Sequence, residues 1–313
     1  MKTNNQIKYH FASKIEGQKL ISEHNDYYLS MSQIDIEWRL KKKGGTIEEL
    51  KELGQKCILE FTEKEKEYIK NSIKFIEESS NSFGFELPFP EQGIIFIKTS
   101  MLEEGGASGY THKNEIYLGE KDFPKIYFLM NEEMKKKALS NFNGLISHEI
   151  FHCLTRNSPK FRKHMYSLIG FNILDKDIDF PPEIKKIIVN NPDVDHMDNY
   201  GEFTIEGVKR KCELIVIFTK TYPEVEAEGR KNDLFFFYIL PVLIPIDTLD
   251  TYYPCNMVPD FLEKIGKNTS YLIAPEEILA DNFKEIVTKS DINSFPNPEL
   301  LKNMIKALQE WNL

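Results

Sequence analysis

The sequence predicts an α+β fold in which helices dominate a small mixed sheet. Segments with apolar residues at three- and four-residue steps occupy both ends of the chain, as in residues 46–61 and 296–311. Short β-rich runs lie between them, bounded by glycine and proline. With 313 residues, 41% of them apolar, the chain can bury a core in one large domain or two modest ones.

The first part of the chain, residues 1–85, is expected to form a helical N-terminal region. Helical spacing of apolar residues runs from about residue 34 to residue 80. Within it, Thr62 followed by Glu65 predicts a capping box, in which each side chain bonds the other residue's backbone N–H at a helix start.

Residues 86–313 are expected to form an α+β domain. A first strand is predicted at 94–100, and a glycine-rich loop leads to a second alternating stretch at 115–120. Helical character returns from about 131 to 156, and Ser158 with Pro159 predicts the N-cap and first residue of the next helix.

The rest of the chain changes character twice. Residues 171–260 mix proline-containing loops with apolar runs, one of which, residues 213–220, has the pattern of a strand. Helical patterns return at 274–289, where Pro275 suits a helix start, and at 296–311.

Composition and charge exclude several classes of function. The formal net charge is −9, and lysines alternate with glutamates rather than gathering in one region, so nucleic acid is not an expected partner. The longest apolar run, 234–246, is shorter than the roughly 20 residues that cross a bilayer and contains Pro241 and Pro245; we expect core, not membrane.

The ends and cysteines of the chain bear on location. The N-terminal stretch MKTNNQIKYHF lacks the apolar region of a secretory signal, so we expect a cytoplasmic protein, with signal-independent export left open. The four cysteines are widely spaced, form no CxxC pair and are expected to be reduced thiols: Cys57, Cys153, Cys212 and Cys255.

The pattern HExxH is formed by His148, Glu149 and His152 in the apolar helical segment FNGLISHEIFHCL. Residues four apart lie on one face of a helix, so the two imidazoles can bind one metal ion. Catalytic zinc sites use three protein ligands and leave a position for water, which Glu149 can deprotonate as the general base. The alternative is a pair of structural histidines that share a helix face.

The third ligand has to come from elsewhere in the chain. The metzincin pattern would need glycine and histidine where the sequence has Thr155 and Ser158. In PEEILADNF, by contrast, Glu277 can bind zinc while Asp281, four residues later, accepts a hydrogen bond from the far nitrogen of a zinc-bound histidine. Glu276 competes for the same role, but Ala280 stands four residues after it and offers no such partner.

These motifs resemble those of the gluzincins, thermolysin-like and related zinc metallopeptidases in which HExxH is completed by a downstream ExxxD or ExxxE helix. The segment SYLIAPEEILADNF, residues 270–283, is similar to that of lethal-factor-type bacterial toxin proteases. The resemblance covers roughly residues 90–160 and 265–290 and implies a zincin-like catalytic domain. The stretch between the two motifs is longer here than in those families, so a subdomain at about 171–260 is expected to be inserted.

Carried onto this sequence, the resemblance implies that His148, His152 and Glu277 bind zinc, that Glu149 is the base, and that Asp281 supports a histidine ligand. It also implies that the strand at 115–120 is the sheet edge that pairs with an extended substrate, although its glycine-rich approach can equally be an ordinary turn.

Two further residues are candidates for stabilising the oxyanion of the reaction. Tyr271 precedes Glu277 by six residues, near the tyrosine of the related toxins, but a buried tyrosine bonded to backbone is the competing interpretation. His196 lies in the polar segment NPDVDHMDNY, where a solvated histidine is the ordinary outcome.

The sequence thus predicts a zinc-dependent metallopeptidase that acts on a protein or peptide. A non-catalytic zinc-containing protein-binding module, and a zincin-fold amidohydrolase with a non-peptide substrate, are the alternatives. The sequence indicates no oligomeric state and no cleavage preference.

Overall fold

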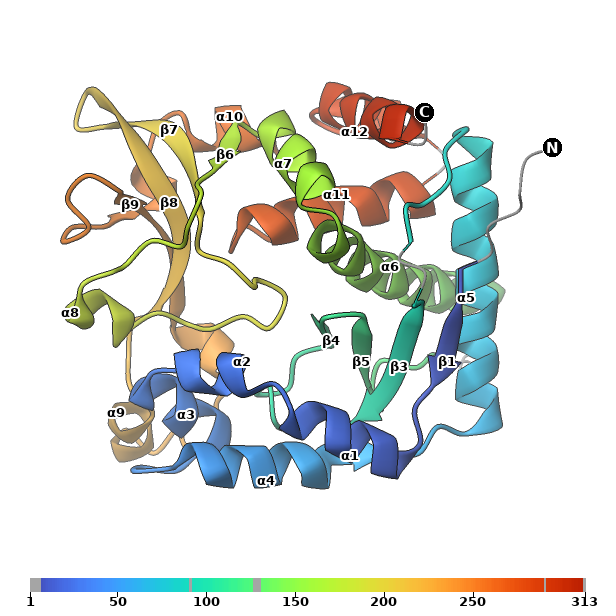
Figure 1. The fold of residues 1–313 in the computed structure, drawn as a ribbon, viewed down its shortest axis with the longest axis horizontal. Coiled ribbons are helices and arrows are strands. Elements are labelled where there is room, and N and C mark those ends of the chain that lie inside the picture. Colours follow the sequence, from blue (N-terminus) through green and yellow to red (C-terminus); the bar gives the residue numbers. More distant parts are fainter. Residues whose placement is uncertain (1–6, 90–91, 126–130, 290, 312–313) are drawn as a thin grey trace.

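The computed structural model describes residues 7–89, 92–125, 131–289 and 291–311. It has two five-stranded sheets, and two long helices, α6 (Glu132–Asn157) and α11 (Pro275–Thr288), lie side by side between them (Figure 1). The predicted α+β class, with more helix than strand, is therefore confirmed. The second sheet was not predicted.

The N-terminal helices wrap one end of the molecule (Figure 1). Their bounds are α1 (Lys14–Ser22), α2 (Asn25–Ser30), α3 (Gln33–Leu40), α4 (Ile47–Cys57) and α5 (Glu63–Ser82). The capping box predicted at Thr62 and Glu65 is present at the start of α5, and Thr46 with Glu49 forms another at the start of α4. Each cap stabilises its helix by about 0.5–2 kcal/mol.

The first sheet, sheet A, contains strands from both predicted regions of the chain. Its strands are β1 (Tyr9–Phe11), β2 (Ile58–Leu59), β3 (Ile94–Thr99), β4 (Gly109–His112) and β5 (Glu115–Gly119). The order is β1-β3-β5-β4, with β2 paired antiparallel to the end of β3. The predicted boundary between the N-terminal region and the α+β domain falls at residue 85. Because β1 and β2 precede this boundary and the other three strands follow it, the boundary would divide sheet A.

The edge of sheet A is not where the sequence placed it. Strand β5 was expected at the edge, but it pairs parallel with β3 on one side and antiparallel with β4 on the other. The edge strand is β4, which arises from the glycine-rich segment that was interpreted as an approach loop. Glycine hides the alternation of a strand, because it contributes no side chain to the pattern.

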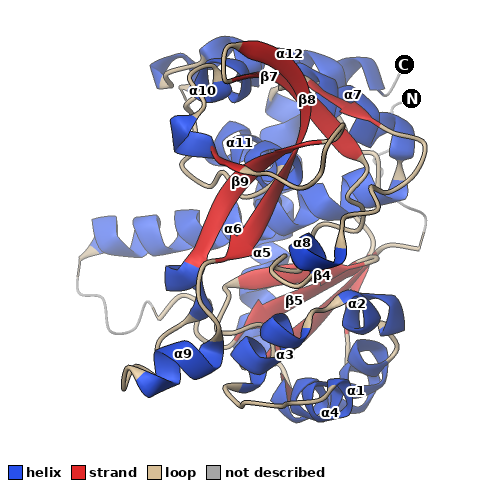
Figure 2. Ribbon diagram, turned by 90° about the vertical axis from the view of Figure 1, so that its left-hand side faces the viewer, coloured by secondary structure: helices blue, strands red, loops and turns tan. Residues whose placement is uncertain are grey.

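The predicted insertion forms the second sheet, sheet B, which is antiparallel in the order β10-β9-β8-β7-β6. Its strands are β6 (Phe171–Ile173), β7 (Asn199–Ile205), β8 (Val208–Phe218), β9 (Ile239–Pro245) and β10 (Tyr253–Pro254), with helices α8 (Pro182–Lys185), α9 (Tyr222–Ala227) and the 3-10 helix η2 (Phe235–Tyr238). In Figure 2, β8 and β9 run above β4 and β5 of sheet A.

The remaining helices close the core around α6 and α11. They are α7 (Pro159–Leu168), α10 (Phe261–Ile265) and α12 (Pro298–Trp311), with 3-10 helices η3 (Cys255–Met257) and η4 (Ile292–Ser294). Ser158 caps α7 and Pro159 is its first residue, as predicted. One apolar cluster joins side chains of both sheets to those of α5, α6, α7, α11 and α12.

The apolar run at 234–246 is core in its second half, where β9 fully buries Val242, Leu243 and Ile244, whereas its first residues include the exposed Leu234, Phe236 and Phe237. The four cysteines are free and buried. Among the described helices, none combines the length and the apolar composition that crossing a bilayer requires.

A buried ion network ties the N-terminal helices to the rest of the protein. The guanidinium of Arg39, on α3, pairs with Asp35 and with Glu104, and its Nη2 donates to the carbonyl of Asn190 at 2.7 Å. Asp35 accepts from the backbone N–H and the side chain of Asn190 at 3.0 and 2.9 Å. Helix α3 thereby holds the segment that begins at Asn190.

Replacing Arg39 by Ala is expected to lower the free energy of unfolding by about 3–5 kcal/mol, because it leaves two buried carboxylates without their cation. Urea denaturation measures this. The matched control is Lys42→Ala, whose ion pair with Glu49 is solvent-exposed and whose loss should leave the midpoint in place. Equal midpoints for all three proteins would contradict the role given to Arg39.

Candidate metal centre

Helix α6 carries the HExxH residues on a buried face. Asn131 caps this helix by accepting from the N–H of Glu133 at 2.7 Å. The last turns of α6 are enclosed by α11, α7 and sheet A, so His148, Glu149 and His152 are all buried. The predicted helix and its inward-facing site residues are therefore present.

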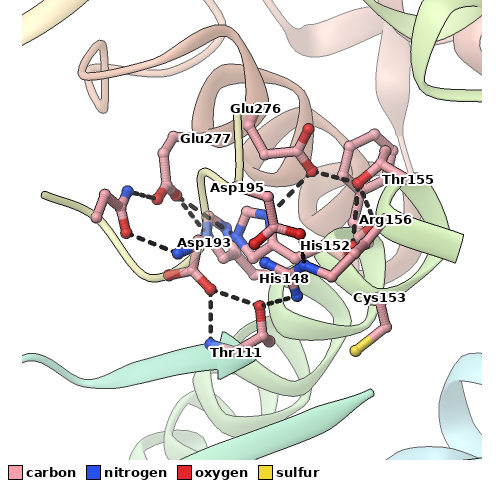
Figure 3. A network of polar contacts seen from close by, with 12 residues as sticks. Thr111, His148, His152, Cys153, Thr155, Arg156, Asp193, Asp195, Glu276 and Glu277 are labelled. Atoms are coloured by element: carbon pink, nitrogen blue, oxygen red, sulfur yellow. Dashed lines mark hydrogen bonds and ion pairs between the residues drawn. The ribbon is translucent and has the colours of Figure 1, made fainter. Parts of the chain in front are cut away.

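Glu277 of α11 faces both imidazoles. Its Oε2 lies 2.9 Å from Nε2 of His148 and 3.6 Å from Nε2 of His152 (Figure 3). The candidate ligand atoms of the three residues lie within 4.8 Å of one another. The structure thus brings together the three side chains that the sequence nominated as metal ligands, although 129 positions separate His148 from Glu277.

Two further carboxylates of α11 hold the opposite nitrogens of the histidines. Asp281 Oδ1 lies 3.3 Å from Nδ1 of His148, in the supporting position predicted for it. Glu276 Oε1 lies 3.1 Å from Nδ1 of His152 and accepts from the hydroxyl of Thr155 (Figure 3). Such partners fix the tautomer and orientation of a ligating imidazole and leave Nε2 free for the metal.

Glu276 was considered only as a rival of Glu277 for the metal, whereas its carboxylate supports the second histidine, His152. A usable signal existed: each of two histidines one turn apart needs an acceptor for its far nitrogen, and Asp281 can supply only one of them.

The protonation of this cluster follows from its burial and its charges. Burial alone would lower the pKa of His148, but its hydrogen bonds to the carboxylates of Asp281 and Glu277 raise it to about 9. Burial would also lower the pKa of His152. The negative charge of Asp193 and the hydrogen bond to Glu276 outweigh this effect, so the pKa of His152 is well above its usual value. The two imidazolium groups hold the pKa of Glu277 well below its usual range despite its burial.

These shifts predict that metal binding releases protons. Zinc needs neutral imidazole, and histidines with raised pKa values carry protons at neutral pH, so protons should leave the site when zinc binds, and the affinity should rise with pH. Calorimetric titration of the metal-free protein with zinc, in buffers of different ionisation enthalpy, counts them. A heat that is the same in every buffer would contradict the prediction.

A loop of the insertion forms the third side of the site. Following Asn190, Asn191 donates its side-chain N–H to Oε1 of Glu277, and Asp193 accepts from the backbone N–H and the hydroxyl of Thr111, both at 2.7 Å. Asp193 is also close enough to Glu149 and His152 for the three to form a second candidate metal group. The loop lies in the segment NPDVDHMDNY, which was singled out for His196, but Asn191 and Asp193 were not predicted as site residues, because nothing local marks the return of this loop to α6.

Glu149 lies against the edge strand. A side-chain carbon at Gly109, on β4, would be 2.5 Å from Oε1 of Glu149, so only glycine leaves space for this carboxylate. Burial and the nearby charge of Asp193 raise the pKa of Glu149 to about 8. The carboxyl is therefore held in a defined place, in an environment that favours proton uptake.

Tyr271 and His196, the two candidate oxyanion stabilisers, are placed differently. The ring of Tyr271 lies at the cluster, with its centroid 6.1 Å from that of His148. His196 is exposed, and its Nδ1 lies 3.3 Å from Oδ1 of Asp177. With Asp177 and Asp198 it forms a separate, mostly exposed group of candidate ligands.

A cleft of about 610 Å³ gives access to the cluster. Its lining includes the site residues His148, Glu149 and Glu277, the backbone of residues 106–109 beside β4, and Tyr271. This volume lies within the usual range for small-molecule and peptide side-chain sites.

The residues present fit a zinc ion by two criteria. Bonds of about 2.0–2.2 Å in a tetrahedral site place ligand atoms about 3.4 Å apart, and the contacts from Glu277 to the two imidazoles bracket that value. Nε2 of His152 and Oε2 of Glu149 are buried and have no hydrogen-bond partner in the described part of the chain. Because orphaned buried polar atoms are costly, a zinc ion on Nε2 of His152 with a water beside Oε2 of Glu149 would give both atoms a partner.

Comparison of the chain with protein-family models, with curated proteins and with solved structures finds no match.

Proposed function

We propose that the protein is a zinc-dependent metallopeptidase with a gluzincin-type site on a zincin-like domain. The observation that carries the proposal is the convergence on one point of two imidazoles and Glu277, with Glu149 beside them and an open cleft in front. Helix α6, which packs on β4 and β5 of sheet A, and an antiparallel edge strand, β4, support the zincin-like assignment.

Each residue has a distinct task in the proposed reaction. His148, His152 and Glu277 hold the zinc ion, which when bound lowers the pKa of water towards about 7 and polarises a carbonyl. Glu149 accepts the proton of the attacking water and returns it to the leaving nitrogen, so that the carboxylate is regenerated.

The environment of Glu149 supports this task. Its pKa of about 8 belongs to a site without a cation, and a positive charge nearby favours the carboxylate over the acid. A base whose pKa is close to neutral can both take a proton from water and release it to the leaving nitrogen. A purely structural metal site has no use for a carboxylate held in this way.

The position of substrate follows from the cleft. Residues 106–109 border it at the start of edge strand β4, where an extended peptide can form backbone hydrogen bonds, whereas farther along β4 the N–H of Thr111 already donates to Asp193. Tyr271 is on the same cleft, next to His148, and we assign to its hydroxyl the stabilisation of the oxyanion.

The proposal is tested by metal analysis combined with digestion of a peptide library derived from a proteome. We expect one zinc per chain, hydrolysis of peptide bonds, loss of hydrolysis with a chelator and recovery with added zinc. Zinc binding with no hydrolysis of any peptide would favour a non-catalytic module. Hydrolysis that survives removal of the metal would contradict the mechanism.

A further inference from the structure

We propose that Asn191 is a positioning residue for the metal ligand Glu277, and that helix α3 keeps Asn191 in place through the neighbouring Asn190. The inference rests on the metal site of the proposed function, but it concerns metal binding and not hydrolysis. It assigns a part of the metal centre to the insertion and to the N-terminal helices, two regions that lie outside the resemblance to the gluzincins.

The two carboxylate oxygens of Glu277 have different partners. Oε2 lies 2.9 Å from Nε2 of His148, whereas Oε1 accepts from the side-chain amide of Asn191. The end of a glutamate side chain rotates over a broad range, so the bond to Oε1 decides that Oε2 is the oxygen presented to a metal. One ligand oxygen instead of two leaves a position of a four-coordinate zinc ion for water.

The amide of Asn191 has a fixed orientation. Its Oδ1 accepts from the backbone N–H of Asp193 at 3.0 Å, which leaves the NH₂ group to donate to Glu277. Pro192 lies between the two and disfavours a helical backbone at Asn191. Because the donor is neutral, it holds the carboxylate without cancelling the charge that attracts a cation.

Asn190 attaches this segment to α3. Its backbone N–H and its side chain donate to Oδ2 of Asp35 at 3.0 and 2.9 Å, and its carbonyl accepts from Nη2 of Arg39 at 2.7 Å. Both partners are buried and charged, so these hydrogen bonds are of the stronger kind. Helix α3 therefore holds the backbone on both sides of residue 190, directly before Asn191.

The competing interpretation is that Asn191 only satisfies a buried carboxylate. Its loss would then lower the stability of the fold and leave the affinity and the coordination of the metal unchanged. The two interpretations therefore differ in a property of the metal itself, which can be measured without any substrate.

The first experiment compares the zinc Kd of the wild type and Asn191→Ala by competition with a chromophoric chelator. The variant should bind zinc about 10- to 100-fold more weakly, the usual effect of losing a partner of a metal ligand. The visible absorption of the cobalt(II)-substituted protein should also change, because Glu277 becomes free to bind through both oxygens. The matched control is Asn143→Ala, which removes a part-buried hydrogen bond to Ser72 on α5 and should keep the Kd within about 2-fold.

A double-mutant cycle tests the route through α3. Asp35→Asn should raise the zinc Kd by about 5-fold or more in the wild type, but by less than about 2-fold in Asn191→Ala, where the positioning group is already absent. Asn190→Ala removes only the side-chain part of the same anchor and replaces Asp35→Asn in the cycle if that variant does not fold. The control on the same helix is Trp38→Phe, which loses the bond to the carbonyl of Lys220 and should leave the Kd in place.

The results separate this inference from the proposed function. Equal Kd values and equal cobalt spectra for the wild type and Asn191→Ala would overturn the role of Asn191. An effect of Asp35→Asn that is as large in Asn191→Ala as in the wild type would overturn the route through α3. A wild type that binds zinc and cleaves no peptide would contradict the proposed function, while the Kd ratios still decide this inference.

Discussion

Replacing Glu277 by Ala is expected to lower zinc affinity by more than about 100-fold and to abolish peptide hydrolysis. Loss of an outer partner of a metal ligand costs 10- to 100-fold in affinity, and Glu277 is assigned to the metal itself. Its removal also leaves Nε2 of His148 without the carboxylate that lies 2.9 Å away. Competition with a chromophoric chelator measures the affinity, and elemental analysis measures the zinc content.

Two variants on the same helix provide a graded control. Glu276→Gln weakens the support of His152, so its zinc affinity should fall by about 10- to 100-fold, which is less than for Glu277→Ala. Glu285→Gln removes a charge from the cleft at a residue with no contact to either histidine, and its affinity should match the wild type. If Glu276→Gln lost more affinity than Glu277→Ala, the assignment of ligand and support would have to be exchanged.

The local parts of the site could be predicted because they depend on helical spacing alone. The spacing of His148 and His152 places both imidazoles on one helix face, and the spacing of Glu277 and Asp281 does the same for two carboxylates. The structure brings these two faces together. Capping at Thr62 and at Ser158 was predictable for the same reason, since it depends on residues three positions apart or fewer.

The parts that depend on long-range packing could not be predicted in this way. Asp193 approaches Glu149 and His152 in a loop that is held at Thr111 and, through the preceding Asn190, at Arg39 and Asp35 of α3, a contact across about half of the chain. No periodicity records such a contact. The short strands β1 and β2 gave no signal either, because two or three residues are too few to show alternation.

Replacing Glu149 by Gln is expected to leave zinc affinity within about 2-fold and to lower kcat by about 10²–10⁴-fold, the usual contribution of a general base. Glutamine has the shape of glutamate, so it fits the space that Gly109 leaves and does not disturb the ligands. It cannot accept the proton of the attacking water. Zinc content and kcat are measured on the same preparation, so that loss of metal is not mistaken for loss of the base.

The comparison with Asp193→Asn decides which carboxylate is the base. Asp193 belongs to a candidate group with Glu149 and His152, and its charge is a main cause of the raised pKa of Glu149 after burial. If Asp193 only tunes Glu149, its replacement should shift the acidic limb of the kcat/KM profile to lower pH, because a like charge that raised the pKa of the base is gone. The rate on the plateau should then change far less than in Glu149→Gln. If Asp193→Asn removed turnover while Glu149→Gln retained it, Asp193 would be the base, and the HExxH glutamate would only shape the site.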